Sequence, residues 1–485
     1  MRSVCSASAY KTSAEPMQDL TEKTDRSLAA LAGFFLMLVL FKFGTPVVLA
    51  HTVTSPANLS QIIEYTWPLN WGYLMLIAFA LALARHFETH TLAPRWITLL
   101  PVAWLGWQFV ATLGAAPASK PLLHATLPHF CACVGCFYLG WGVLGRLRHP
   151  AWMGLGLATG LFAALAIGVQ LHQNLTYLRQ QVERLESKGP AAMEPVLLET
   201  FVKQGTVTLR GDHALVNPEF KRRLERGRAQ SLYGSPNSFA GAILLTLPVS
   251  LFVLFHAGRH WRPPWFWLPP TGLAALGVLC LFWSGSKAGW LVALVLLGVV
   301  LLNLEWPRRW KLGVTAAVLV CGLAAFAFKY QDYFARGATS LGARFDYWRA
   351  AGATAQAHPF TGTGPGTFQV AYASYRKKHP QRKMEPTKLA HNDYLQQASD
   401  SGLPGFALYT TFILGSLVLL WRKTRGDPLG FAVWLGVLAW AVQGVVDYGL
   451  YVPALAWPAF FGIGWLWGRP NLVDTPADCQ QDDSA

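Results

Sequence analysis

The chain has 485 residues, of which 53% are hydrophobic and 13% charged, and it contains 21 Trp. This composition is typical of a protein that crosses a membrane several times, and it excludes an ordinary soluble enzyme. The net charge of +15 does not indicate nucleic acid as a partner, because membrane proteins collect Lys and Arg on their cytoplasmic face.

The seven cysteines do not predict a metal site. Cys131, Cys133 and Cys136 share one apolar segment, and the two separated Cys-x-x-Cys pairs of a zinc site are missing. We interpret these three as small core-packing residues.

Residues 1–26 are polar and lack a short apolar core with a cleavage site, so we expect a mobile cytoplasmic tail rather than a signal peptide. Apolar segments of membrane-crossing length then fill residues 27–171. They lie near 27–50, 65–84, 95–115, 122–145 and 151–171. Lys42 falls inside the first of them, and we expect its long side chain to reach back to the membrane interface.

Residues 172–236 are hydrophilic and form the first long loop. Its apolar residues Leu175, Leu178, Val182 and Leu185 recur at helical spacing, so part of this loop is expected to be an amphipathic helix. Further spans are predicted within 237–329, near 237–257, 265–284, 286–304 and 312–329. A second long loop occupies 330–402.

The last spans are predicted within 403–467, near 403–421, 429–446 and 450–467, before an acidic cytoplasmic tail at 468–485. The predicted fold class is therefore all-α: a polytopic membrane protein with about twelve transmembrane helices and two long external loops.

Cations are distributed unequally between the two faces of the predicted membrane protein. The short connections on one face hold 17 Lys and Arg, whereas those on the other hold only Lys120 and Lys287. This asymmetry places both termini in the cytoplasm and both long loops outside. Each long loop has ten cations, against seven acidic residues in 172–236 and five in 329–403. Both loops are net positive and suit an anionic substrate.

A transferase that works outside the cytoplasm cannot use cytoplasmic ATP. It needs a substrate that already carries its leaving group, such as a sugar chain on a lipid pyrophosphate. Transfer to a hydroxyl requires a base, and the departing pyrophosphate requires fixed cations. Histidine and arginine fit these two tasks.

His391 opens HNDYLQQASDSGLPG, a segment of the second loop that is expected to form a short helix before a span. Asn392 or Asp393 is expected to cap this helix, and Gly402 with Pro404 to end it. The positive end of the helix dipole favours the neutral imidazole, which is the form of a general base. We expect Asp393 or a backbone carbonyl to orient the ring.

Arg344 precedes Phe345, Tyr347 and Trp348, aromatic residues that can hold a loop at the membrane interface. A guanidinium at the membrane interface can form two parallel hydrogen bonds to a pyrophosphate. The same pattern is also explained if Arg344 only anchors the loop at the interface and has no chemical role.

The glycines at 362, 364 and 366 form a second motif of this loop. They lack the Lys-Ser/Thr ending of a phosphate-binding P-loop, so a tight turn is predicted rather than a nucleotide site.

In combination, motifs between residues 225 and 420 resemble the O-antigen ligase and O-antigen polymerase family of bacterial envelope proteins. That family has an Arg before a Pro-Asn or Gly-Asn turn, and RAQSLYGSPNSFA places Arg228 there. It has a Ser-Arg-Gly or Ser-Arg-Ala segment at an external helix start, where SGSKAGW has Lys287. Its Arg-x-x-x-Trp pattern, its His-Pro and Gly-rich stretch, and its His-Asn pair resemble residues 344–348, 358–366 and 391–392.

The resemblance implies a fold like that of C-type glycosyltransferases and an inverting transfer of glycan from undecaprenyl pyrophosphate to an acceptor hydroxyl. No metal or cofactor is implied, and the site is expected to face the periplasm from the bacterial inner membrane. The roles that the resemblance implies are His391 as base, Arg344, Lys287 and Arg228 as pyrophosphate ligands, and Asn392, Asp393 and Trp348 as supporting residues.

The acceptor stays open at this point, because ligases use lipid A core, polymerases use another repeat unit and relatives use a protein. Two other classes of function are also considered. A transporter of a small anion such as bicarbonate predicts charged residues inside the spans. An envelope scaffold predicts that the external His and Arg are dispensable.

Overall fold

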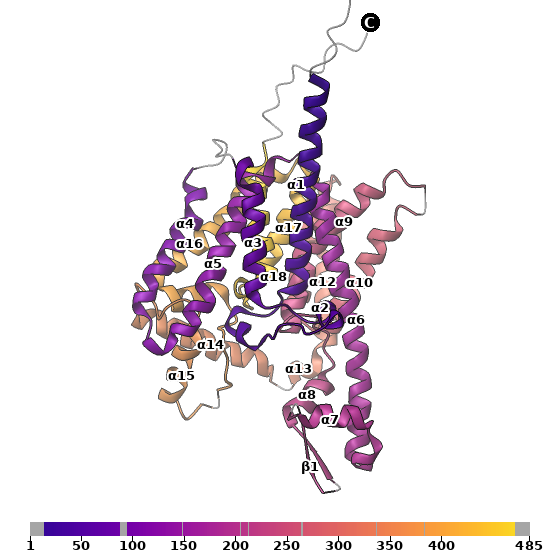
Figure 1. Ribbon diagram of the computed structural model, residues 1–485, viewed down its shortest axis with the longest axis vertical. Coiled ribbons are helices and arrows are strands. Elements are labelled where there is room, and N and C mark those ends of the chain that lie inside the picture. Colours follow the sequence, from indigo (N-terminus) through magenta and orange to yellow (C-terminus); the bar gives the residue numbers. More distant parts are fainter. Residues whose placement is uncertain are drawn as a thin grey trace, which may run out of the picture.

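The computed structural model describes residues 14–87, 95–147, 149–203, 205–211, 213–262, 265–335, 337–382 and 384–470. These residues form a bundle of helices with one small β-hairpin (Figure 1). Most of the two predicted tails, at 1–13 and 471–485, lies outside the described residues. Ala14 already belongs to helix α1, so this helix extends back into the segment expected to be a mobile tail.

Each predicted span overlaps a helix. These helices are α1 (Ala14–Lys42), α3 (Leu69–Leu83), α4 (Arg95–Ala111), α5 (Lys120–Gly142), α6 (Ala151–Lys188), α9 (Pro236–Gly258), α10 (Leu268–Ser284), α11 (Lys287–Asn303), α12 (Arg308–Lys329), α16 (Asp393–Thr424), α17 (Pro428–Gln443) and α18 (Pro453–Gly468). Helix α1 ends at Lys42 rather than near residue 50, and α16 begins at Asp393 rather than near residue 403. Among the described residues, 8 helices are long and apolar enough to cross a membrane, and α10, α11 and α17 are shorter apolar helices. The all-α class is confirmed, whereas the number of spans stays a prediction.

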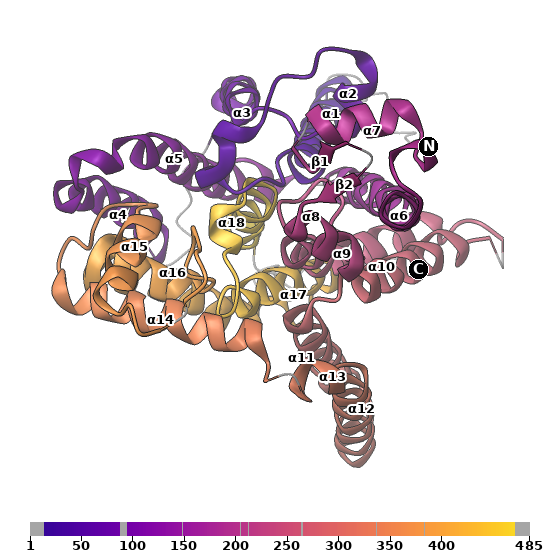
Figure 2. The ribbon, with the colours of Figure 1, turned by 90° about the horizontal axis from the view of Figure 1, so that it is seen from below.

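Helix α18 lies inside the bundle, because every residue from Pro453 to Gly468 is buried. Its sequence is apolar all round, as a helix surrounded by other helices requires. Helices α5, α1 and α17 pack against it (Figure 2). The close approach to α5 depends on a missing side chain, since a Cβ on Gly464 would lie 2.0 Å from the carbonyl oxygen of Phe137.

The remaining helices pack around this centre. Helix α1 packs on α6, α17 on α9, and α4 on α16, while α12 lies at the edge of the bundle (Figure 2). Cys133 and Cys136 of α5 are buried in the core as predicted, whereas Cys131 is exposed.

Lys42, at the end of α1, is only 2% exposed, so the prediction that it reaches the membrane interface is wrong. Its ammonium donates to the carbonyl of Tyr65 at 3.3 Å and also to that of Ile63. Both carbonyls belong to the C-terminal end of α2 (Leu59–Glu64), where helix carbonyls lack intrahelical partners. The buried cation is therefore compensated by backbone oxygens.

The first long loop is a small subdomain built on α6. This helix does not end near residue 171 as predicted but continues to Lys188, because no Gly or Pro occurs between residue 171 and Gly189. It is followed by α7 (Pro195–Lys203), the antiparallel strands β1 (Val207–Arg210) and β2 (His213–Val216), and α8 (Pro218–Arg226). The predicted apolar face is confirmed, since the core of this subdomain includes Leu175, Leu178, Val182 and Leu185.

The second long loop is also largely helical, with α13 (Gln331–Ala335), α14 (Thr339–Ala357) and α15 (Phe368–Lys378). Its sequence lacks apolar periodicity because α14 buries only a narrow stripe of Tyr347 and three alanines. Helix α14 packs against α15 and α16. Figure 1 shows α8, α13 and α15 at the same end of the bundle, opposite the beginning of α1.

Candidate active site

His391 lies immediately before α16, in the position predicted for it. Asn392 is the N-cap of this helix, and its side-chain oxygen accepts a hydrogen bond from the backbone N–H of Leu395 at 2.9 Å. The helix breaks at Gly402, which has φ 69° and ψ −176°. The predicted cap and the predicted break are both confirmed.

The backbone of His391 has φ 51°, in the left-handed region that a residue with a side chain seldom adopts. Neighbouring hydrogen bonds hold it there. The carbonyl of His391 accepts from Nε1 of Trp348 at 3.4 Å, and the N–H of Ala390 donates to Oε1 of Gln396 at 2.8 Å. A strained backbone fixed in this way is common at functional sites.

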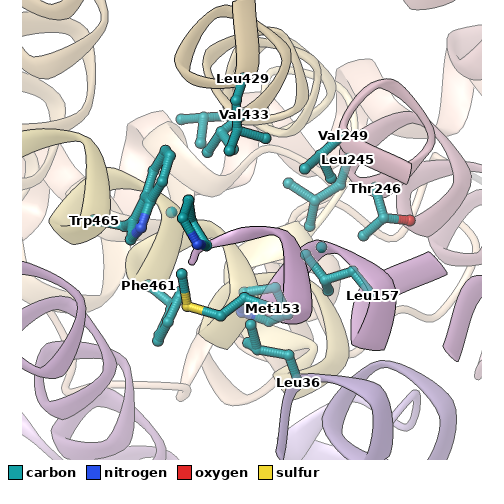
Figure 3. A pocket seen from close by; sticks show the side chains of 15 residues that line it. Leu36, Met153, Leu157, Leu245, Thr246, Val249, Leu429, Val433, Phe461 and Trp465 are labelled. Carbon is teal, nitrogen blue, oxygen red and sulfur yellow. The ribbon is translucent and has the colours of Figure 1, made fainter. Parts of the chain in front are cut away.

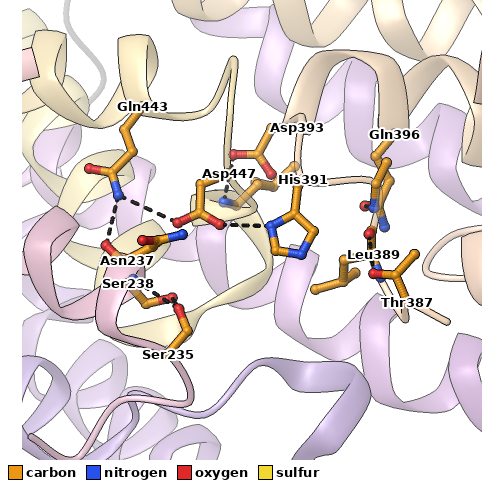
Figure 4. Close-up of polar contacts among 12 residues, drawn as sticks. Ser235, Asn237, Ser238, Thr387, Leu389, His391, Asp393, Gln396, Gln443 and Asp447 are labelled. Carbon is orange, nitrogen blue, oxygen red and sulfur yellow. Dashed lines mark hydrogen bonds and ion pairs between the residues drawn. The ribbon is translucent and has the colours of Figure 1, made fainter. Parts of the chain in front are cut away.

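Asp447 is the partner of the His391 ring. Its Oδ1 lies 3.3 Å from Nδ1 of His391, and the Asp447 side chain is only 3% exposed (Figure 4). The two atoms lie at an ion-pair distance without the alignment of a hydrogen bond, and neither makes a hydrogen bond to another described residue. A carboxylate that faces Nδ1 favours the tautomer with the proton on that nitrogen, in which Nε2 is the acceptor.

Asp393 does not orient the ring, so that expectation is corrected. Its carboxylate accepts the backbone N–H of Leu450 at 2.9 Å, and its own N–H donates to the carbonyl of Gly444 at 2.7 Å. Both partners belong to the connection between α17 and α18, which also carries Asp447. Asp393 therefore fixes the start of α16 against the segment that supplies the partner of His391.

Two tyrosines enclose the imidazole. The ring of Tyr347 is stacked on it at 5.8 Å between centroids, and the ring of Tyr448 meets it edge-on at 4.7 Å. Burial raises the pKa of Tyr347, and burial together with the nearby Asp447 charge raises the pKa of Tyr448 to about 12. Both phenols stay neutral at physiological pH. The His391 side chain is 25% exposed, which leaves it accessible to a substrate.

A chain of polar contacts leads from Asp447 to Arg228. Nε2 of Gln443 lies 3.5 Å from Oδ2 of Asp447 and donates to the carbonyl of Asn237 at 2.8 Å (Figure 4). The Asn237 side chain accepts from Nη2 of Arg228 at 2.9 Å, and Nε of Arg228 donates to the carbonyl of Ser284 at 2.6 Å. The start of α9 and the end of α10 thus hold the guanidinium near the His391–Asp447 pair.

Arg228, Lys287 and Arg344 form a cluster of positive charge. The Arg228 and Arg344 charges act on one another and on Lys287. Burial is the main cause that lowers the pKa of Arg228, yet a guanidinium remains charged. The ammonium of Lys287 lies 3.9 Å from the ring centre of Tyr333 and 4.8 Å from that of Tyr330.

None of these three cations makes an ion pair with a carboxylate of the described residues, and Nε of Arg344 is buried without a hydrogen bond to them. Charged groups that are partly buried and lack protein counterions indicate an anionic ligand.

A cavity of about 770 Å³ adjoins the cluster. Arg228 is part of its wall, together with residues of α6, α8 and the segment before His391. A second, much smaller cavity of about 50 Å³ lies among α1, α6, α9, α17 and α18 (Figure 3). Its wall is almost wholly apolar: Thr246 already donates to the carbonyl of Ala242, and Trp465 adds an indole N–H that is buried without a hydrogen bond to the described residues. Of these two cavities, only the larger has a residue of the cation cluster, Arg228, in its wall.

The three glycines of the second loop form a tight turn, as predicted. All have positive φ, of 63°, 103° and 75°. The N–H of Gly364 donates to the carbonyl of Asp400 at 2.8 Å, and that of Gly366 to the Asp400 carboxylate at 2.9 Å. These donors bind the end of the first α16 segment, so they are occupied and are not an anion site.

Asp400 helps to fix the backbone of the segment that carries His391, a role that the sequence did not indicate. Its Oδ2 also accepts from Tyr451 at 2.9 Å and from Nε2 of Gln396 at 3.3 Å. Gln396 in turn holds Ala390. The turn, Asp400 and Gln396 thus fix the backbone next to His391.

The structure brings together all the residues expected at the site, namely His391, Asn392, Asp393, Arg344, Trp348, Lys287 and Arg228. Sequence reasoning missed Asp447, Gln443 and Tyr448, and it expected Tyr347 at the membrane interface rather than against the imidazole. One signal for Asp447 was present: it is the sole acidic residue between Pro428 and Gly468, in an otherwise apolar stretch. In the part of the chain that the structure describes, no group of three or more His, Cys, Asp or Glu is placed to hold a metal.

A family model described as O-antigen ligase matches residues 272–410. The matched segment contains Lys287, Arg344, Trp348 and His391, whereas Arg228 and Asp447 lie outside it. A comparison with curated proteins gives no match.

Proposed function

We propose that this member of the O-antigen ligase family transfers a glycan from undecaprenyl pyrophosphate to an acceptor hydroxyl at the external face of the bacterial inner membrane. The family itself indicates glycosyl transfer of the ligase or polymerase kind. The observation that carries the finer proposal is the His391–Asp447 pair beside cations without acidic partners.

His391 acts as the general base in this proposal. With Nδ1 turned to Asp447, Nε2 takes the proton of the acceptor hydroxyl, and the buried carboxylate stabilises the imidazolium that forms. Tyr347 and Tyr448 hold the ring in place. The contact with Asp447 shortens when the substrate excludes water, as is common for sites observed without a ligand.

The acceptor oxygen forms its bond to the anomeric carbon while the bond from that carbon to the pyrophosphate oxygen breaks, with inversion at the carbon. The pyrophosphate leaves with the bonding electrons and gains negative charge. Arg344 offers two-point binding, and Arg228, whose Nε and Nη2 are bound to Ser284 and Asn237, donates from Nη1. Lys287 adds a point charge at the start of α11, where the helix N-terminus is also positive. The donor supplies the energy, so no ATP and no cofactor is needed.

The cation asymmetry of the short connections supports a cytoplasmic location for both termini and a periplasmic location for the site. The polyprenyl tail of the donor then lies in the membrane while its glycan extends toward the external helices. Membrane lipids surround the bundle, and nucleic acid has no role.

The acceptor is proposed as a class only: a hydroxyl of lipid A core, of another glycan repeat unit, or of a protein side chain. A transporter of a small anion receives no support, because the buried cation Lys42 is bound to backbone carbonyls at a helix end rather than placed along a path. A scaffold role gives no reason for the unpaired cations near His391.

The proposal is tested by reconstituting the full chain in vesicles with an undecaprenyl-pyrophosphate-linked glycan. Lipid A core, a second lipid-linked repeat unit and an unfolded peptide rich in Ser and Thr are offered as separate acceptors. We expect release of undecaprenyl pyrophosphate and a glycosylated product with one of them. A chain that binds the donor but releases no undecaprenyl pyrophosphate with any acceptor contradicts the proposal.

A further inference from the structure

We infer that the cavity between α6 and α8 binds a negatively charged saccharide group of the substrate, such as a phosphate or a uronic acid carboxylate. This inference rests on the proposed function, because it specifies the class of substrate that the same site takes. It adds residues that lie outside the proposed pyrophosphate cluster.

Arginines dominate the polar wall of this cavity. Arg222 and Arg226 are four residues apart on α8, so their side chains share one face of the helix, and Arg228 follows just after the helix ends. The wall contains one carboxylate, that of Glu385. Neither Arg222 nor Arg226 makes an ion pair with the described residues. The cavity is therefore net positive and open to an anion.

The positive charge exceeds what the pyrophosphate needs. A pyrophosphate esterified at both ends carries two negative charges, one on each phosphate, and the three cations Arg228, Lys287 and Arg344 already exceed them. Arg226 acts electrostatically on both Arg228 and Lys287. The arginines of α8 therefore lie next to the cluster formed by Arg228, Lys287 and Arg344. The surplus on α8 is available to a second anionic group.

The other wall suits a sugar. Helix α6 contributes Leu171, Leu175 and Leu178, which offer an apolar surface for the C–H face of a ring, and Asn174 and His172 beside them. The His172 ring is held by stacking on Trp283 at 4.5 Å, and its Nδ1 is buried without a hydrogen bond to the described residues. The volume of about 770 Å³ falls within the roughly 300–1,000 Å³ usual for ligand pockets.

The cavity is connected to His391 along one wall. The carbonyl of Glu385 accepts from the hydroxyl of Tyr372 at 3.0 Å, and the Tyr372 ring meets that of Tyr347 at 5.3 Å between centroids. Tyr347 stacks on His391. Arg228 gives the second connection, through Asn237 and Gln443. A saccharide in the cavity therefore lies next to the groups that hold the base.

Two parts of the substrate carry this chemistry: the acceptor saccharide and the glycan of the donor. The test separates them with two pairs of substrates. In the donor pair, the lipid-linked glycan either contains or lacks a uronic acid, and the acceptor is neutral. In the acceptor pair, a neutral donor meets a phosphorylated or a dephosphorylated core oligosaccharide.

The variant is the double substitution Arg222→Gln and Arg226→Gln in the full chain, and the matched control is Arg179→Gln. Arg179 is on the same subdomain but pairs with Glu183 at 2.9 Å and does not line the cavity. A direct binding measurement uses fluorescent tetragalacturonate and maltotetraose without any donor, so that it reports on the cavity even if transfer is not observed.

Loss of two charge-assisted contacts is expected to raise KM for the charged member of one pair at least about tenfold, with kcat and the neutral member unchanged. The double variant should also bind tetragalacturonate more weakly than the parent and the control do. The affected pair identifies the source of the charge. Equal losses for charged and neutral substrates would assign these arginines to the pyrophosphate site and overturn the inference, and so would unchanged KM and unchanged tetragalacturonate binding.

Discussion

Asp447 Oδ1 and His391 Nδ1 lie 3.3 Å apart although the two residues come from different connections of the bundle. His391 precedes α16, and Asp447 lies between α17 and α18. The carboxylate is buried, and among the described residues it forms no ion pair with a Lys or Arg side chain. This relationship gives the first prediction.

Asp447→Asn should keep the shape of the side chain and remove its charge. Without a carboxylate at Nδ1, the imidazole loses its fixed tautomer and the stabilisation of its protonated form. We expect kcat to fall about a hundredfold to ten-thousandfold, with little change in KM for the donor. Steady-state kinetics in vesicles measures both.

The control for Asp447 is Asp427→Asn. Asp427 lies just before the N-terminal end of α17 and pairs with Arg469 at 2.9 Å. The proposed chemistry lies at the opposite, C-terminal end of this helix. Its transfer rate should equal that of the parent chain. An Asp447→Asn variant with the parental kcat would show that the carboxylate does not act on His391.

Lys287 stands where the related family has arginine, and its ammonium lies against the rings of Tyr330 and Tyr333. Because a guanidinium also stacks well on aromatic rings, Lys287→Arg should retain activity, whereas Lys287→Gln should raise KM for the donor and lower kcat. The matched control is Lys120→Gln, which alters the other cation of the outer short connections. Full activity in Lys287→Gln would leave Arg344 and Arg228 as the pyrophosphate ligands.

Topology is tested by cysteine labelling of intact spheroplasts in a cysteine-free background. Ala373→Cys, on the exposed face of α15, should react with a membrane-impermeant thiol reagent, because both long loops are predicted to be external. Gly426→Cys, in the exposed turn between α16 and α17 with open space around its backbone, should react only after the membrane is opened. The reverse pattern would place the site in the cytoplasm and remove the argument for a lipid-linked donor.

Gly402 allows the sharp break between the two parts of α16. Its φ is 69°, and a Cβ there would lie 2.1 Å from the carbonyl oxygen of Phe360. Gly402→Ala should therefore destabilise the fold by more than about 2 kcal/mol. Gly352→Ala, in the interior of α14 with nothing within 4 Å of the added atom, should stabilise by roughly 0.5–1 kcal/mol. Thermal unfolding in detergent distinguishes the two, and equal midpoints would contradict the assigned backbone strain.

Local features of this protein were predictable from sequence, whereas contacts between distant segments were not. The Asn392 cap, the break at Gly402 and the glycine turn depend on a few neighbouring residues, so residue type alone indicates them. The spans were recognisable because a membrane requires long apolar runs. Helix α14 escaped recognition, since its buried stripe consists mostly of alanine.

The partner of His391 could not be identified in this way. Asp393 is adjacent in sequence, but the helix that begins there turns its carboxylate toward Leu450. Asp447 reaches the ring only because α16, α17 and α18 pack together. The environment of Lys42 could not be predicted for the same reason. The carbonyls that bind its ammonium come from a segment that folds back over the end of α1.

The most direct test of the central claim is the transfer rate of His391→Ala. The substitution removes a ring that packs against Tyr347 and Tyr448 and faces the buried Asp447, so membrane accumulation and binding of the lipid-linked glycan are measured beside the rate and should match the parent chain. The matched control is His379→Ala, at the end of α15, where the ring contacts only Tyr375 among aromatic residues of the described chain. The account predicts that release of undecaprenyl pyrophosphate by His391→Ala falls about a hundredfold or more, while His379→Ala keeps the parental rate. A folded, donor-binding His391→Ala chain with the parental rate would contradict it.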